Sequence, residues 1–105
     1  MIDISASKVV QIIFQSREGH EAEPELRAFI AGLNVDEATA LVALAWVGRG
    51  TFGADEFAQA QTTARAEATT PTEDYLIGMP DLAENLEAGL ETMGIDVTGE
   101  EEDLL

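Results

Sequence analysis

The feature that most constrains this chain is an apolar run, Leu41-Val42-Ala43-Leu44-Ala45-Trp46-Val47, followed at once by Gly48-Arg49-Gly50. If the run is a helix, it is apolar on all sides and has to be surrounded by other helices. If it is a buried strand, the glycines after it favour a nucleotide-binding sheet. The conformation of these ten residues therefore decides which class of fold the chain adopts.

Local signals favour the helix. Asn34 is a good helix N-cap, and the acidic residues Asp36 and Glu37 suit the positive end of a helix dipole. The run itself is rich in alanine and leucine and has only two β-branched residues, Val42 and Val47. We therefore predict a central helix over residues 36–47 that ends at the following glycines.

A second motif overlaps the end of this helix. Gly48-Arg49-Gly50-Thr51-Phe52-Gly53 matches G-x-G-x-x-G, and Glu67 follows about 20 residues after the first glycine, as in dinucleotide-binding folds. That motif requires a strand before it and a second strand after the next helix, but Ala68 is followed by Thr-Thr-Pro-Thr-Glu-Asp. We predict that the glycines end a helix and reverse the chain, and that no cofactor binds there.

Further helices are predicted on both sides of the central one from apolar spacing, caps and glycine stops. They run from Ser5 or Ser7 to about Glu18, from Pro24 to Gly32, from Ala54 to about Ala68, from Thr70-Pro71-Thr72-Glu73 to Gly78, and from Pro80 to Gly94. The Thr70–Glu73 segment has the pattern of a capping box, and the thin stripe Phe57, Ala60, Ala64 places its helix at the periphery.

These signals together predict an all-α fold, a compact bundle of five or six short helices around a central apolar helix, with no sheet. The bundle is expected to form a single domain over residues 1–95, and the last ten residues, 96–105, to form an acidic disordered tail that holds five of the chain's acids.

The charge of the chain limits its partners. Asp and Glu number 21 and Lys and Arg only 5, which gives a formal net charge of −16. The bases are scattered along the sequence, so binding to nucleic acid or to an anionic membrane surface is not expected. A basic protein partner suits the charge, and so does the simpler interpretation that acidity keeps a small protein soluble.

Other functions are disfavoured by composition. There is no cysteine and one histidine, His20, so neither a zinc site nor a thiol nucleophile is expected. No acidic segment has the ligand spacing of a calcium loop, and no metal is predicted. No apolar run approaches the roughly 20 residues that span a bilayer, so we expect a cytoplasmic protein of a bacterial cell.

Several segments together resemble one family. They are Glu25-Leu26-Arg27-Ala28-Phe29-Ile30, Leu33-Asn34, the run Leu41–Gly50, Tyr75-Leu76-Ile77-Gly78 and Leu86-Glu87-Ala88-Gly89-Leu90. The chain resembles, over roughly residues 4–94, a bacterial and mostly proteobacterial family of small acidic proteins classified as domain of unknown function 3775. The resemblance implies an all-helical domain with no assigned activity. The chain departs from the family pattern in a shorter loop around His20 and in its acidic tail.

Two candidate sites follow from the residues. Trp46, Arg49 and Tyr75 are predicted to form a mixed aromatic and cationic pocket for a ligand such as a carboxylate or phosphate. The simpler alternative is that Arg49 caps its own helix and pairs with one of four nearby acids, Asp55, Glu56, Glu73 or Asp74.

The second candidate is an acidic ridge, Asp81, Glu84, Glu87 and Glu91, on the last helix, which has no basic neighbour at helical spacing. The ridge either binds a cationic partner or is a solvated helix face.

The function predicted first is non-enzymatic: a module that binds a protein or a small anionic ligand. The alternative is an acidic nucleic-acid mimic that occupies a basic DNA- or RNA-binding protein through the ridge. An enzyme that uses carboxylates ranks last, because no pair among the many acids is singled out. The partner and the oligomeric state stay open.

Overall fold

The computed structural model describes residues 2–95, and within that range the chain forms six α-helices, two short 3₁₀ turns and no strand. The elements are α1 (Ala6–Arg17), η1 (His20–Ala22), α2 (Glu23–Ala31), α3 (Val35–Arg49), η2 (Ala54–Glu56), α4 (Phe57–Ala66), α5 (Thr72–Ile77) and α6 (Leu82–Thr92). The predicted all-α fold is confirmed. The acidic tail predicted for residues 96–105 lies outside the described residues.

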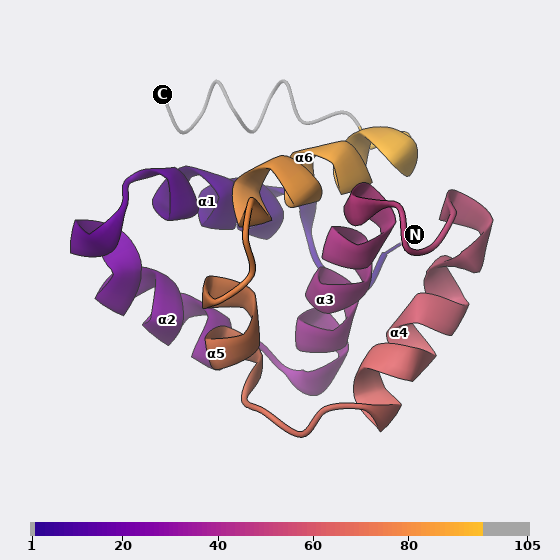
Figure 1. The fold of residues 1–105 in the computed structure, drawn as a ribbon, viewed down its shortest axis with the longest axis horizontal. Helices are drawn as coiled ribbons and strands as arrows, with labels where there is room; N and C mark the ends of the chain where they lie inside the picture. Colours follow the sequence, from indigo (N-terminus) through magenta and orange to yellow (C-terminus); the bar gives the residue numbers. More distant parts are fainter. Residues whose placement is uncertain (1, 96–105) are drawn as a thin grey trace.

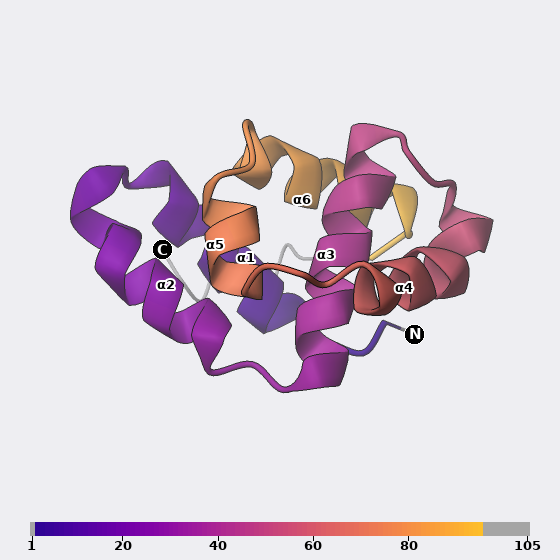
Figure 2. The ribbon, with the colours of Figure 1, turned by 60° about the horizontal axis from the view of Figure 1, so that its bottom comes forward.

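Helix α3 is the centre of the fold. Its residues Thr39 to Val47 are all buried, as the apolar run predicts. Helices α6 and α4 pack directly on α3, while α1 packs on α6 and α2, and α2 packs on α5 (Figures 1 and 2). A helix that is apolar all round is therefore covered by its neighbours, which is the arrangement such a helix needs.

The ends of α3 follow from local chemistry. The Asn34 side chain accepts a hydrogen bond from the Glu37 backbone N–H at 2.8 Å, and the Glu37 carboxylate accepts one from the Asn34 N–H at 3.1 Å. This capping box satisfies two N–H groups that the helix leaves free. At the other end, Gly50 adopts a φ of 93°, a conformation that glycine takes without steric cost.

The predicted glycine stop of α3 is confirmed, but the helix runs two residues beyond Val47 before it ends. The helix continues through Gly48 and Arg49, and only Gly50 turns the chain. Gly48 has a different role: a Cβ there would lie 1.7 Å from the backbone oxygen of Asn85 in α6. A Cβ on Gly89 of α6 would likewise lie 2.4 Å from the backbone oxygen of Leu44. The two glycines let the backbones of α3 and α6 cross in contact, so the first glycine of the G-x-G-x-x-G motif is a packing residue.

Two other helix starts differ from prediction. Helix α5 begins at Thr72 with Pro71 as its N-cap, and no side chain caps it, so the predicted Thr70 capping box is wrong. Pro71 has an extended ψ of 139°, so the helix can begin only after it. Helix α6 begins at Leu82 and not at Pro80, because Asp81 takes a left-handed conformation with φ 58° that interrupts a helical path.

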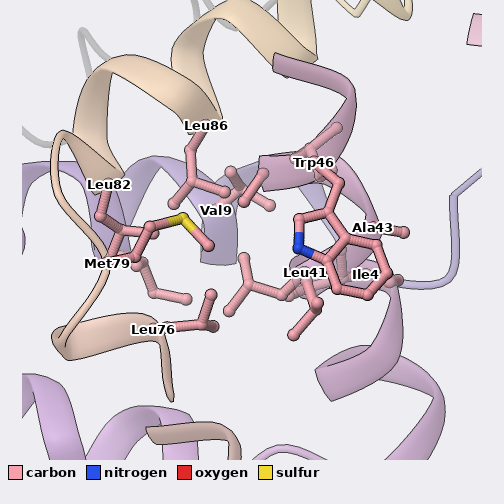
Figure 3. Packing of buried hydrophobic residues seen from close by; sticks show 14 of the residues in the cluster. Ile4, Val9, Leu41, Ala43, Trp46, Leu76, Met79, Leu82 and Leu86 are labelled. Carbon is pink, nitrogen blue, oxygen red and sulfur yellow. The ribbon is translucent and has the colours of Figure 1, made fainter. Parts of the chain in front are cut away.

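The core is shared mainly by α1, α2, α3, α5 and α6. Figure 3 shows Val9 of α1, Leu41 of α3, and Leu82 and Leu86 of α6 converging, with Leu76 of α5 beside them. Helix α4 contributes only two buried residues, both alanines, Ala60 and Ala64, which confirms its peripheral place. Within residues 2–95, no helix combines the length and apolarity that crossing a membrane requires.

Candidate functional site

Two of the three residues predicted for a ligand site meet in the structure. The indole Nε1–H of Trp46, near the end of α3, donates a hydrogen bond of 2.9 Å to the phenol oxygen of Tyr75 in α5. Trp46 is 9% exposed and Tyr75 is 38% exposed, so the pair joins the core to the surface. Phe52 stacks on the indole with ring centroids 5.8 Å apart, which together with Tyr75 holds the ring in one orientation.

A pocket of about 170 Å³ opens beside this pair. One wall comes from α3, and the other comes from the end of α4, the segment that joins α4 to α5, and α5 itself. Figure 2 shows this joining segment passing in front of α3. The lining residues are Thr39, Val42, Trp46, Ala64, Glu67, Ala68, Thr69, Thr70, Thr72 and Tyr75. We call this the Trp46–Tyr75 pocket.

The polar groups of the pocket are mostly hydroxyls. The Thr39 hydroxyl is already used, because it donates to the Val35 backbone oxygen at 3.0 Å. Within the described chain the hydroxyls of Thr69, Thr70 and Thr72 make no hydrogen bond to protein. The Tyr75 oxygen accepts from Trp46, which leaves its own O–H free to donate. The pocket therefore offers several hydrogen-bonding groups to a ligand.

Arg49, the third predicted residue, does not line the pocket. It is the last residue of α3, its side chain is exposed, and its Nε donates to the Thr51 hydroxyl at 3.2 Å. The predicted alternative of an ion pair with Asp55, Glu56, Glu73 or Asp74 is wrong, since Arg49 forms no ion pair with any described residue. Asp74 is paired with Arg27 instead.

The acidic ridge is not free of bases in three dimensions. Arg17 of α1 forms an ion pair with Glu87 and lies 3.8 Å from Glu84, measured from Nη2 to Oε2. Asp81 lies in the turn before α6, and Glu91 is exposed near its end. The ridge spacing along α6 could not reveal a base from another helix. The single charge of Arg17 offsets one of the four ridge charges within the molecule.

A second pocket, of about 380 Å³, was not predicted from the sequence. It lies between the end of α1, η1, α2 and the start of α6. Its lining includes the charged side chains of Arg17, Glu23, Asp81 and Glu84, the imidazole of His20, and apolar residues such as Leu26 and Leu82. Only the packing of α1 and α2 against the α5–α6 turn brings these residues together.

One carboxyl has a clearly perturbed acidity. The pKa of Glu37 is lowered, first by its hydrogen bond from Lys8 and then by the Asn34 backbone N–H. This group belongs to the cap of α3 and lines neither pocket. Among residues 2–95, no cluster of three or more acids and histidines is placed to hold a metal ion.

The fold and the site define the class: a small all-helical domain with an aromatic and hydroxyl-lined pocket between its central helix and the α4–α5 connection. The chain belongs to the family described as protein of unknown function (DUF3775), whose model matches residues 23–95. The match covers the central helix, the Trp46–Tyr75 pocket and α6, and it confirms the resemblance found in the sequence. No curated protein and no solved structure matches the chain.

Proposed function

We propose that the protein is a non-enzymatic binding module that takes a small molecule in the Trp46–Tyr75 pocket. The observation that carries this proposal is the meeting of a fixed, largely buried indole with hydroxyls that have no protein partner. Concave apolar sites with a few convergent polar groups are the usual form of ligand sites. A volume of about 170 Å³ suits a small ligand, since a cavity of roughly 150 Å³ holds benzene.

The lining supports binding better than catalysis. Glu67 is its only formally charged side chain, and that side chain is exposed. A nucleophile needs a base within hydrogen-bonding reach, and the one histidine, His20, borders the other pocket. The threonines and Tyr75 therefore serve recognition.

The nucleic-acid mimic predicted as an alternative receives less support. Such a mimic needs an array of uncompensated negative charges. Arg17 lies against two of the four ridge acids, Glu84 and Glu87, and reduces the charge that the ridge presents. The buried indole and the hydroxyl-lined pocket therefore support small-molecule binding better than the ridge supports mimicry of a nucleic acid.

A fragment screen followed by NMR tests the proposal. The chain has one tryptophan, so its indole N–H gives one distinct signal that reports directly on the pocket. Fragments that bind are expected to shift this signal. Ala68→Leu places a larger side chain in the lining and is expected to abolish these shifts.

Ala66→Leu is the matched control, because Ala66 is exposed at the end of α4 and does not line the pocket. This variant is expected to bind fragments as the parent protein does. If no fragment shifts the indole signal, or if Ala68→Leu leaves the shifts unchanged, the pocket is not a binding site.

A further inference from the structure

We infer that the ligand of the Trp46–Tyr75 pocket is a small organic cation, an inference that rests on the proposed function. The lining contains one formally charged side chain, the carboxylate of Glu67, and no lysine, arginine or histidine. An anion bound there would meet a like charge and no counter-charge. A cation would gain an opposite charge at the rim.

The distribution of the bases strengthens this charge preference. The chain holds only 5 Lys and Arg against 21 Asp and Glu. Lys8, Arg17, Arg27 and Arg65 each form an ion pair with an acid, so their charges are largely offset where they lie. Arg49 lies outside the lining. The field of the whole molecule therefore concentrates cations and repels anions at a concave surface.

The uncharged groups of the pocket suit the same ligand class. Aromatic rings attract cations through their quadrupole, most strongly in tryptophan. The hydroxyl oxygens of Thr69, Thr70 and Thr72 carry lone pairs that can accept from an ammonium N–H or from a hydroxyl on the ligand. The ligand is thus a monovalent amine or quaternary ammonium compound with few atoms, as the volume of about 170 Å³ requires.

Three probes of nearly equal shape separate charge from size: choline, its uncharged carbon isostere dimethylbutanol, and the anion dimethylbutyrate. Each is titrated into the full chain at low salt, and binding is followed by the fluorescence and the indole N–H signal of Trp46. Choline is expected to bind at least about threefold more tightly than dimethylbutanol, from cation–π attraction and an exposed ion pair. Dimethylbutyrate is expected to bind most weakly.

Glu67→Gln tests the charge at the rim. It is expected to weaken choline binding about two- to fivefold and to leave dimethylbutanol unchanged, because only the cation loses a charged partner. Glu91→Gln is the matched control: it removes the same charge from an exposed position outside the lining, and choline binding should stay as in the parent protein.

The outcomes separate this inference from the proposed function. Equal binding of choline and dimethylbutanol, or tighter binding of dimethylbutyrate, overturns the cation and leaves the pocket as a binding site. If Glu91→Gln weakens choline binding as much as Glu67→Gln does, the preference is a property of the net charge and the inference fails. If choline does not bind while fragments still shift the indole signal, the organic-cation inference fails and the pocket remains a binding site. If neither choline nor any fragment binds, the inference and the proposed function both fail.

Discussion

At the scale of single residues, Trp46 links the core to the pocket. Its ring is part of the hydrophobic cluster, yet its N–H reaches Tyr75, which is itself more than a third exposed. A buried indole N–H needs a hydrogen-bond partner, so Tyr75 stabilises the position of the indole and shapes the pocket at the same time. The pair was anticipated from the sequence because Trp46 lies near the end of the most apolar segment and Tyr75 is the only tyrosine.

Arg49 illustrates the limit of such reasoning. It lies three residues after Trp46, so helical spacing places the two on similar faces. One further turn of helix nevertheless carries the long side chain past the pocket, where it meets Thr51. The direction taken by an exposed arginine depends on its surroundings and is not encoded in the spacing.

Glu37 yields a prediction about pH. Its pKa in the folded protein is lowered by Lys8 and by the Asn34 N–H, so it stabilises the fold above the pKa of the unfolded chain. That contribution is lost as the pH falls through the lowered pKa. We expect Glu37→Gln to reduce the free energy of unfolding at about pH 6, and the difference from the parent protein to shrink by about pH 3.

Urea unfolding of both proteins at the two pH values measures this difference. Glu91→Gln serves as a comparison, because Glu91 forms no ion pair with any residue in the range 2–95 and its removal only relieves repulsion. A destabilisation by Glu37→Gln that is the same at both pH values would contradict the assignment.

At the scale of elements, the crossing of α3 and α6 depends on two glycines, Gly48 and Gly89. Each lets a backbone oxygen of the other helix approach closer than any side chain allows. Close backbone approach compensates for the small side chains at the crossing by increasing van der Waals contact. Neither glycine breaks its helix, since each lies within regular α-helix.

Substitution of these glycines is predicted to be costly. We expect Gly48→Ala and Gly89→Ala each to lower the free energy of unfolding by more than about 2 kcal/mol, because the helices must move apart. Denaturant unfolding checks the values.

Gly32→Ala is the matched control, since a Cβ there would meet its nearest atom, the Ala28 oxygen, at an ordinary 3.5 Å. This variant is expected to change stability by less than about 1 kcal/mol. Equal effects at Gly48 and Gly32 would show that the crossing is looser than the structure indicates.

The connection between α4 and α5 is the element that makes the pocket. Residues 67–71 cross in front of α3 (Figure 2). Besides Glu67, this connection contributes only the small side chains of Ala68, Thr69 and Thr70 to the pocket lining, and bulkier residues there would fill the pocket. Sequence alone marks this stretch as a helix boundary, from its threonines and Pro71. That it covers Trp46 follows only from how α4 and α5 dock on the rest of the bundle.

At the scale of the whole molecule, charge is the dominant feature. Four of the five bases form ion pairs between helices: Lys8 with Glu37, Arg17 with Glu87, Arg27 with Asp74 and Arg65 with Asp36. Each pair joins segments distant in sequence. Such exposed pairs contribute about 0–1 kcal/mol each, whereas the many remaining acids repel one another.

Net repulsion predicts a response to salt. We expect the midpoint of thermal unfolding to rise as sodium chloride increases from about 10 mM to about 300 mM, because screening weakens the repulsion more than it weakens a few ion pairs. Relief of about 1 kcal/mol would raise the midpoint by about 4–8 °C. Calorimetry at several salt concentrations measures the midpoint of thermal unfolding. A midpoint that stays flat or falls with added salt would show that charge repulsion does not significantly destabilise the fold.

What the sequence determined by itself was the set of helices, because caps, glycine stops and apolar spacing act between residues a few positions apart. Asn34 capping α3, Gly50 ending it and the apolar run between them are local facts of this kind. The tertiary structure alone decided that Gly48 is a packing residue, that Arg17 reaches the ridge on α6, and that the α4–α5 connection and α3 enclose a pocket. These contacts join residues far apart in the chain, and their energies depend on how whole helices dock, which no short stretch of sequence specifies.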